Sequence, residues 1–285
     1  MMIVSFYSQV LPIVVLYKQR IDQSLTLSTL NQNLTDLGIK MDIFLYDNSP
    51  EKQYDQHLFQ WENFNITYLH DTKNSGLSKA YNTGADHAKT LKKKWILLLD
   101  QDTDFPAGFL KENQQSIIQH PDISLFAPML KLKNDVLFSP CIAKHKRGYP
   151  PGHLYPGVYS LWYFSPVNSG MLISLALFDE VGGYNEKVKI DFCDFQFLEK
   201  VRKVNDKFYL IDATALQDFS SFELSSAKQK TRFIQYLEDA LNCEKPGLAD
   251  KFGFFYTVSR HALGLSLKLR DPSFFGLYVR NYLMR

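Results

Sequence analysis

Two carboxylates one residue apart, Asp100 and Asp102, follow directly on the apolar run Trp95–Leu99. Acids in this pattern, at the exit of a buried strand, can point at a single divalent cation. Mg²⁺ and Mn²⁺ prefer oxygen ligands and often complete their coordination shell with substrate phosphates. A loop whose acids only cap the following helix would have the same composition. The pattern therefore predicts a cation site for a phosphorylated ligand, with a structural turn as the alternative.

A second pair of acids, Asp191 and Asp194, is spaced three residues apart. At the start of a helix this spacing places both side chains on one face. One of the two can act as a general base beside a cleft. The alternative is that both stabilise the helix N-terminus through its dipole.

A third cluster, Asn74-Ser75-Gly76, begins a helical pattern that runs to about Leu91 and contains Asn82. Glycine lets the backbone approach a ligand closely, and the free N–H groups of a helix N-terminus attract anions. Ser75 is the expected cap of this helix. The alternative is an ordinary capped helix with a surface asparagine.

These clusters need elements that position them, and the first hundred residues alternate between strand and helix patterns. Strands are predicted at Val10–Tyr17, Met41–Tyr46, Ile66–Leu69 and Trp95–Leu99. Strands that alternate with helices predict right-handed crossovers and a mainly parallel central sheet with flanking helices, which is an α/β fold.

The ends of these strands carry a functional expectation. Ligands of open parallel sheets bind beyond the carboxyl ends of the strands. Polar segments lie at or just past those ends, namely Tyr17, Asp47-Asn48, Asp71–Gly76 and Asp100–Asp102. We therefore expect these groups to line one crevice.

The second half of the chain is less regular. Residues 131–165 are rich in Pro, Gly, Tyr and Trp, which predicts a long loop region with short strands. The elements expected after it are a strand at 167–173 and helices at about 191–203, at 226–241 and from 250 onward. Because no linker is evident, we predict one domain over 1–245 and a helical extension over 246–285.

Composition and missing motifs exclude several classes of protein. Lys plus Arg is 32 and Asp plus Glu is 30, and a net charge of +2 argues against a nucleic-acid binder. The sequence contains no GxGxxG, Walker, HExxH or GxSxG motif. Its seven histidines lack metal-ligand spacing, and its three cysteines are too widely spaced for a disulfide framework.

Taken together and in this order, the clusters resemble the family 2 glycosyltransferases of the GT-A fold over about residues 11–260. The matching segments are Val14–Tyr17 as the opening strand, Asp47-Asn48-Ser49 as a nucleotide-contacting turn, Asn74–Gly84 as the N-x-G…A-x-N-x-G segment, Leu98–Asp102 as a DxD-type loop in the variant DQD, and Asn168-Ser169-Gly170 with Phe178–Tyr184 before the catalytic helix. The resemblance implies an enzyme that moves a sugar from a nucleotide diphosphate donor to a hydroxyl, with Mg²⁺ or Mn²⁺ as cofactor.

The resemblance also implies roles for individual residues. Asp194 matches the catalytic base of an inverting transfer, with Asp191 as the second candidate, and Asp102 with Asp100 would hold the metal. The implied contacts to the nucleotide sugar are Tyr17, Asp47, Asn48, Ser49, Asn74, Gly76, Asn82, Asp100 and Gln101. The implied contacts to the acceptor are Trp162, Asn168, Ser169 and Gly170.

Within the family, the DQD loop, the N-S-G segment and Ile190–Asp194 look most like bacterial rhamnosyltransferases. That likeness implies dTDP-rhamnose as donor and a glycan or lipid-linked glycan as acceptor, in the synthesis of O-antigen, capsule or other cell-surface polysaccharide. Two positions depart from the pattern. Gln217-Asp218-Phe219-Ser220 stands where the family often has His-x-x-Gly, so a third metal ligand is not implied there. Gln196 stands where an acid is usual.

Three other functions remain open: transfer from a UDP-hexose donor, a sugar-1-phosphate nucleotidyltransferase, and a non-catalytic carbohydrate-binding protein on the same fold. Nucleotidyltransferases normally carry a Gly-rich basic signature after the first strand, where this chain reads Tyr17–Ile21 without glycine. The presence of both acid pairs argues against a non-catalytic protein.

The two ends of the chain bear on its location. Residues 1–17 have no basic segment of the kind that starts a secretion signal. Residues 252–285 combine aromatic and basic side chains, a composition that suits the surface of an anionic membrane or, alternatively, packing on the catalytic domain. We therefore expect a cytoplasmic protein, with peripheral contact at the inner face of the plasma membrane as a possibility.

Overall fold

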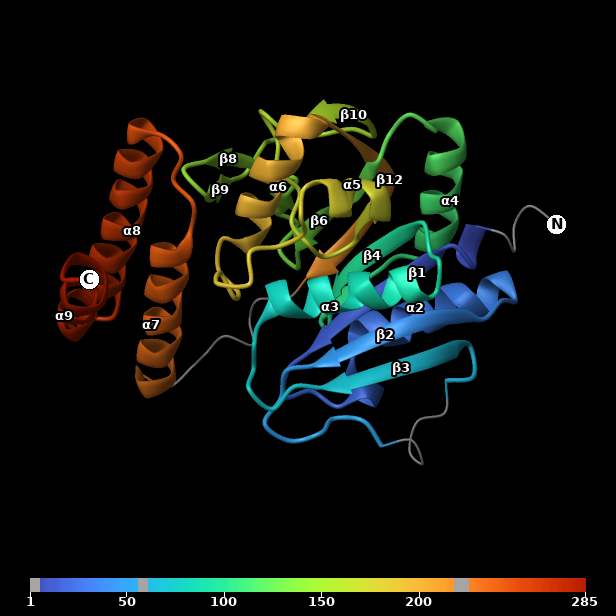
Figure 1. Ribbon diagram of the computed structural model, residues 1–285, viewed down its shortest axis with the longest axis horizontal. Coiled ribbons are helices and arrows are strands. Elements are labelled where there is room, and N and C mark those ends of the chain that lie inside the picture. Colours follow the sequence, from blue (N-terminus) through green and yellow to red (C-terminus); the bar gives the residue numbers. More distant parts are fainter. Residues whose placement is uncertain (1–5, 56–60, 218–225) are drawn as a thin grey trace.

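The computed structural model of the protein describes residues 6–55, 61–217 and 226–285, and it has a central sheet with helices on both faces (Figure 1). The strand order is β10-β12-β6-β11-β4-β1-β2-β3, with β5 paired to β12 and β7 paired to β6. The strands are β1 (Val10–Leu16), β2 (Met41–Asp47), β3 (Phe64–His70), β4 (Trp95–Asp100), β5 (Thr103–Asp104), β6 (Leu125–Leu132), β7 (Leu137–Ser139), β10 (Gly157–Ser160), β11 (Met171–Ser174) and β12 (Lys207–Gln217). A separate hairpin consists of β8 (Ile142–Lys144) and β9 (Arg147–Tyr149).

The predicted α/β fold with a mainly parallel sheet is confirmed. β1 pairs in parallel with both β2 and β4, and β2 pairs in parallel with β3. All seven residues of β1 are buried, as expected for a central strand covered on both faces. β11 is antiparallel to both of its neighbours, β4 and β6, and this change of direction separates the parallel half from the strands that follow.

Helices cover the two faces of the sheet with separate apolar cores. One core contains residues of α3 (Leu77–Thr90), α5 (Leu175–Glu180) and α6 (Cys193–Val204). The other contains residues of α2 (Leu25–Leu37) and α4 (Phe109–Gln119). Successive side chains of a strand point to opposite faces of the sheet. Leu11 and Ile13 of β1 therefore belong to the first core, and Val10 and Val14 belong to the second.

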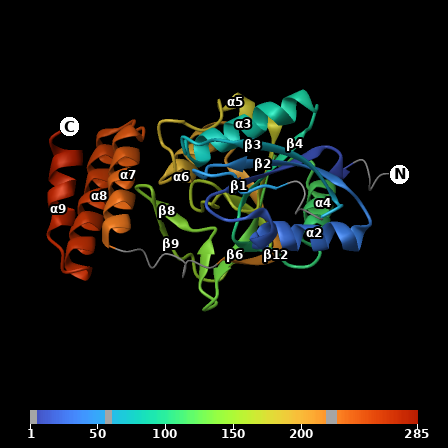
Figure 2. The ribbon, with the colours of Figure 1, turned by 90° about the horizontal axis from the view of Figure 1, so that it is seen from below.

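Three helices near the C-terminus lie together at one end of the molecule, as Figures 1 and 2 both show. They are α7 (Ser226–Asn242), α8 (Leu248–Lys268) and α9 (Ser273–Tyr278), followed by a π-helical turn, η3 (Val279–Leu283). Their buried side chains, among them Phe233, Phe254 and Phe274, join the same core as α3 and α6. The division at 245/246 stays a prediction, and α7, which precedes it, groups with the extension.

The structure differs from the expected elements in several places. The strand expected at 167–173 begins only at Met171, because Gly170 adopts φ +82° and residues 168–170 form a turn. α4, β6 and β12 were not predicted, although the buried and exposed residues of β12 largely alternate. None of the helices in the described part of the chain combines the length and the hydropathy needed to cross a membrane.

Candidate active site

Asp100, Gln101 and Asp102 form the acidic loop, which lies at the carboxyl end of β4. The side chain of Gln217 bonds both of its acids. The Gln217 side-chain amide donates to Asp102 at 3.2 Å and to Asp100 at 3.4 Å. It reaches them because β12 ends beside β5, with Gln217 opposite Thr103 in the ladder. Residues 218–220, the rest of the segment that departs from the family pattern, lie outside the described residues. From the sequence, Gln217 was only a departure from the family's His-x-x-Gly pattern. The structure places its side chain beside both acids.

Asp100 lies in a strongly anionic environment. Burial raises its pKa to about 7, and the negative charges of Asp102 and Asp194 add to the rise. Hydrogen bonds from Gln217 and from the buried Tyr81 hydroxyl, 3.3 Å away, act in the opposite direction. Ionisation of this carboxyl beside another carboxylate is costly, and a bound cation would lower the free energy of the ionised pair.

The donor set fits Mg²⁺ or Mn²⁺. Among the described residues no three His, Cys, Asp or Glu side chains cluster as a complete metal site. Two carboxylates with oxygens from a bound diphosphate are, however, the usual way in which proteins hold Mg²⁺. Asp100 and Asp102 therefore fit a cation that arrives with its phosphorylated ligand.

Residues behind the loop hold it in place. The Asp100 amide donates to the Ser169 hydroxyl at 3.3 Å, and Ser169 also bonds Thr103 Oγ1 at 2.7 Å. Gly170, which follows, donates its amide to the Leu98 carbonyl at 2.8 Å, and a Cβ at Gly170 would lie 2.6 Å from Pro128. Ser169 and Gly170, predicted as acceptor contacts, thus support the acidic loop.

The turn after β2 is built by the residues predicted to contact the nucleotide. Asp47 is fully buried, and its carboxylate accepts the amides of Ser49 and Gln53, both at 2.9 Å, and the Tyr68 hydroxyl. The Ser49 hydroxyl accepts the Lys18 amide at 2.7 Å, and Asn48 Oδ1 accepts the amide of Gly76.

Tyr17 and Gln101 form one edge of the crevice. The Gln101 side chain accepts the Tyr17 amide at 2.8 Å and donates to the Tyr17 carbonyl at 3.2 Å, so the acidic loop is tied to the end of β1. Tyr17 is 43% exposed at this edge. It therefore offers a face on which a planar group can stack.

The start of α3 differs from the expectation. Gly76, not Ser75, is the residue before the helix, and no side chain caps it. The Lys189 carbonyl instead accepts the amides of Leu77 at 2.7 Å and Ser78 at 3.4 Å. The predicted anion site at this helix N-terminus is therefore corrected, because the N–H groups that would bind the anion are occupied. Gly76 has φ +95°, and a Cβ there would lie 2.6 Å from that carbonyl oxygen.

The two asparagines of this segment bond other parts of the chain. Asn74 has φ +49° and donates its backbone amide to the Asp71 carbonyl in the turn before α3. Asn82 clamps the chain before α6, because it accepts the Tyr184 amide at 2.8 Å and donates to the Tyr184 carbonyl at 3.0 Å. Asn82 is thus engaged by protein rather than free for a ligand.

Asp194 lies in the first turn of α6. Burial raises its pKa to about 6, the charge of Asp191 adds to the rise, and the amide of Phe195, 2.8 Å from Oδ1, opposes it. The helix is preceded by Phe192 in a left-handed conformation, φ +66°. Aromatic contacts with Tyr236 and Phe254 hold this unfavourable conformation.

Asp191 has a different environment. Arg232 on α7 forms a two-point ion pair with it, one contact of which is Nη2 to Oδ1 at 2.9 Å. Both carboxylate oxygens are therefore occupied by a guanidinium, a strong and geometrically specific arrangement. Of the two candidate bases, Asp194 keeps the more available carboxylate.

Asp239 fixes the segment directly before α6. This fully buried carboxylate on α7 accepts the backbone amides of Lys189 at 2.8 Å, Ile190 at 3.0 Å and Asp191 at 2.9 Å. Arg232 and Asp239 were not predicted. Locally, the sequence shows only a guanidinium and a carboxylate seven residues apart on one face of a helix. Many exposed helices carry the same pattern, so it does not indicate contact with a site.

Asp194 lies within electrostatic reach of Asp100. The charge of Asp194 contributes to the raised pKa of Asp100, so the two carboxyls lie close enough to interact. Tyr81, which bonds Asp100, stacks obliquely on Tyr184 with ring centroids 5.4 Å apart. The Tyr184 hydroxyl in turn donates to Asn168 at 2.6 Å.

Trp162 alone of the predicted acceptor residues is exposed, at 55%. Asn168 and Ser169 are buried, and Asn168 bonds Tyr184 and the Cys193 thiol. The Trp162 ring lies 4.4 Å from the guanidinium carbon of Arg202 on α6, which fixes the ring at the surface.

The repulsion in the acidic loop predicts a stability effect that depends on pH. The folded-state pKa of Asp100, about 7, is above its unfolded value, so stability falls as pH rises from about 4 to 7. Asp102→Asn removes one charge of the pair. With a chelator present, we expect it to raise the melting temperature by roughly 2–4 °C at pH 8 and by much less at pH 5.

The matched control is Asp212→Asn, an equal change at an exposed residue of β12, for which we expect no such pH difference. The measurement is thermal unfolding of both variants at the two pH values. Equal shifts of Asp102→Asn at pH 5 and pH 8 would contradict the proposed repulsion.

Comparisons with known proteins agree with this geometry. Residues 14–174, more than half of the chain, match the family model "Glycosyl transferase family 2". No curated protein matches the chain in sequence. The fold is similar to that in the crystal structure of GalNAc-T7 with UDP, GalNAc and Mn²⁺, at a TM-score of 0.52 and 12% identity. That similarity covers 90% of this chain and 57% of the other, so this chain spans little more than half the length of that protein. The chain therefore belongs to glycosyl transferase family 2 and is a glycosyltransferase with the GT-A fold.

Proposed function

We propose that the protein transfers a sugar, with inversion, from a nucleoside diphosphate donor to a hydroxyl of a glycan or lipid-linked glycan. The observation that carries this proposal is that the charge of Asp194 contributes to the raised pKa of Asp100, whose carboxyl shares the Gln217 amide with Asp102. One carboxyl with a pKa of about 6 thus lies beside a site suited to a metal-bound diphosphate. A base and a leaving-group site at this proximity are what a single displacement requires.

Asp194 is proposed as the base in preference to Asp191. It takes the proton of the acceptor hydroxyl as that oxygen bonds to the anomeric carbon, while the bond to the nucleoside diphosphate breaks. A pKa near 6 leaves the carboxyl ionised at neutral pH yet more basic than an exposed aspartate. The role proposed for Asp191 is to keep the start of α6 in position through Arg232.

Asp100 and Asp102 are proposed to hold Mg²⁺ or Mn²⁺ together with the donor diphosphate. The structurally similar GalNAc-T7 was crystallised with UDP and Mn²⁺, which supports a divalent cation here. Such a cation stabilises the negative charge that develops on the departing diphosphate. The exposed Tyr17 ring is proposed to stack on the base, beside the turn that Asp47, Asn48 and Ser49 build.

The donor is proposed to be dTDP-rhamnose, on the motif resemblance of the DQD loop and Ile190–Asp194, with a UDP-hexose as the alternative. The corresponding setting is bacterial O-antigen, capsule or related polysaccharide synthesis on the cytoplasmic side of the membrane. A nucleotidyltransferase or a non-catalytic carbohydrate-binding protein would not need a base beside the metal carboxylates.

The outer face of α8 supports peripheral contact with a membrane. Large apolar side chains recur along it at helical spacing and are 46–78% exposed, namely Leu248, Phe252, Phe255, Tyr256, Leu263 and Leu267. Residues 248–285 carry six Lys and Arg against two Asp. An apolar stripe with a net positive charge is the combination that anionic lipid surfaces attract.

Variants of the two acids test the choice of base. We expect Asp194→Asn to lower kcat by about 10²–10⁴-fold, the usual contribution of a positioned base. Asp191→Asn should reduce kcat less, because it loosens α6 without removing the base. The wild-type kcat should fall below pH 6, as Asp194 becomes protonated. Near-normal turnover of Asp194→Asn would show that the base lies elsewhere.

The donor is tested by thermal unfolding with dTDP-rhamnose, UDP-glucose, UDP-galactose and GDP-mannose, each with and without Mn²⁺. A ligand that binds only the folded state raises the melting temperature by mass action. We expect dTDP-rhamnose with Mn²⁺ to give the largest rise, and Asp102→Asn to abolish the part that depends on Mn²⁺. If no nucleotide sugar stabilises the protein under either condition, the proposed function is wrong.

Membrane contact is tested by co-sedimentation with vesicles that contain anionic lipid. We expect Phe252→Ser with Leu267→Ser to reduce binding several-fold. Ile118→Ser, which removes an equally exposed apolar side chain from α4, is the control and should have no effect. Unchanged sedimentation of the double variant would count against the contact.

A further inference from the structure

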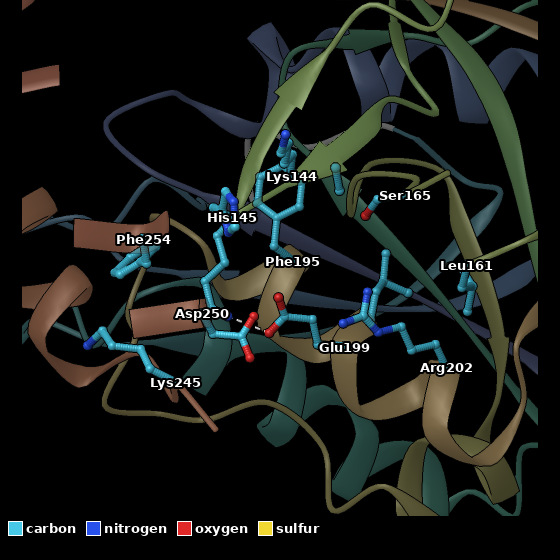
Figure 3. Close-up of a pocket in the computed structure, with 13 residues that line it drawn as sticks. Lys144, His145, Leu161, Ser165, Phe195, Glu199, Arg202, Lys245, Asp250 and Phe254 are labelled. Atoms are coloured by element: carbon cyan, nitrogen blue, oxygen red, sulfur yellow. Dashed lines mark hydrogen bonds and ion pairs between the residues drawn. The ribbon is translucent and has the colours of Figure 1, made fainter. Parts of the chain in front are cut away.

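A cavity of about 210 Å³ lies beside α6, and the acidic loop is not part of its lining. Figure 3 shows the residues that line it. Its walls are the β8–β9 hairpin, one face of α6, and the start of the C-terminal helical region with Lys245, Asp250 and Phe254. Neither the nucleotide site nor the base accounts for this cavity.

The walls of the cavity are firmly held. His145, at the hairpin turn, packs so closely on α8 that a Cβ at Gly253 would lie 2.1 Å from its ring. The adjacent Lys146 is buried, pairs with Glu199 on α6, and lies 5.8 Å from the centre of the Phe254 ring. The hairpin, α6 and α8 therefore meet through specific contacts, so that the cavity is a built feature of the fold.

The cavity has more cations than anions. Lys144, Lys146, Arg202 and Lys245 line it against Glu199 and Asp250. Lys146 neutralises Glu199, and the Lys245 amine donates to three carbonyl oxygens at the end of α7. The positive charges of Arg202 and Lys144 then exceed the single negative charge of Asp250.

Arg202 has unused capacity to donate hydrogen bonds. Its Nε is buried and has no hydrogen-bond partner among the described residues. Its guanidinium stacks on Trp162 and faces the same space as the Glu199 carboxylate (Figure 3). A guanidinium held flat by an aromatic ring presents its planar fork to a phosphate or a carboxylate.

The cavity also lies beside the proposed base. Phe195, the residue after Asp194, lines it, as does Ser165. Ser165 pairs with Cys141 through two backbone hydrogen bonds of 2.8 Å, and the charge of Asp194 helps to raise the pKa of Cys141. Asp194 and Arg202 are eight residues apart on α6, a separation of about 12 Å along the helix.

We propose that this cavity binds an anionic group, a phosphate or a carboxylate, carried by the acceptor. The inference rests on the proposed function, because it places the acceptor hydroxyl at Asp194 and the anionic group at Arg202 and Lys144. Because Asp194 and Arg202 are about 12 Å apart along α6, the charged group of the acceptor lies well away from the reacting hydroxyl.

The experiment is calorimetric titration of the full chain with pyrophosphate and, separately, with glucuronate, at low ionic strength and with a chelator present. The chelator keeps pyrophosphate from binding as a metal complex at the acidic loop. We expect Arg202→Gln to weaken binding at least about 10-fold, the effect of losing a charge-assisted contact of about 1.4 kcal/mol. Lys144→Gln, at an exposed side chain that folding does not require, should weaken binding several-fold.

The matched control is Lys203→Gln, the same charge change at the next residue of α6, which is exposed and does not line the cavity. Binding of pyrophosphate alone, glucuronate alone or both, weakened in the two cavity variants and unchanged in the control, supports the proposal and identifies the source of the anion. Absence of binding, or equal binding in all variants, overturns it. Nucleotide-sugar binding with Mn²⁺, measured on the same samples, shows independently whether the proposed function holds.

Discussion

The site depends on how its carboxylates are compensated, because ionised acids at the edge of an apolar core are costly. Asp239 is compensated by three backbone amides and Asp191 by a guanidinium. Among the described residues, the Asp100 carboxyl receives hydrogen bonds from Gln217 and Tyr81, and the Asp194 carboxyl receives the amide of Phe195. Burial raises the pKa of Asp239 as well, but its three amides tie it to the chain before α6, whereas Asp100 and Asp194, with pKa values of about 7 and 6, have fewer partners.

This division explains why residues that look alike in the sequence have different roles. Asp191 and Asp194 are three residues apart and equally plausible as a base until Arg232 is seen. Asn82 and Asp47 match positions implied to contact the donor, yet their side chains are engaged by Tyr184 and by the turn after β2. The geometry of the site therefore comes from polar residues buried behind it, and only a few side chains reach the crevice.

Much of the parallel half of the fold could be predicted from the sequence, because its buried strands are continuous apolar runs that end in polar turns. The same reasoning and the family resemblance together predicted that Asp100, Asp102 and Asp194 share one site, and this stays a prediction. The sequence could not supply Gln217, Arg232 or Asp239. These residues reach the site through an unpredicted strand and through packing of α7, contacts with no local pattern. The cap of α3 was wrong because the acceptor is a carbonyl 112 residues away, at Lys189, rather than the adjacent serine.

The grip of α7 on the segment before α6 limits how this protein can be divided. Asp239 and Arg232 bind that segment directly, so the C-terminal helices are not an appendage that a shorter protein could lack without consequence. A chain cut before α7 would expose the amides of Lys189, Ile190 and Asp191 to water and free the turn that leads to Asp194. Exchange of C-terminal regions between relatives would therefore preserve the position of Asp194 only if the incoming helix brought an equivalent carboxylate and guanidinium. The helices outside the sheet thus support the segment that carries the proposed base.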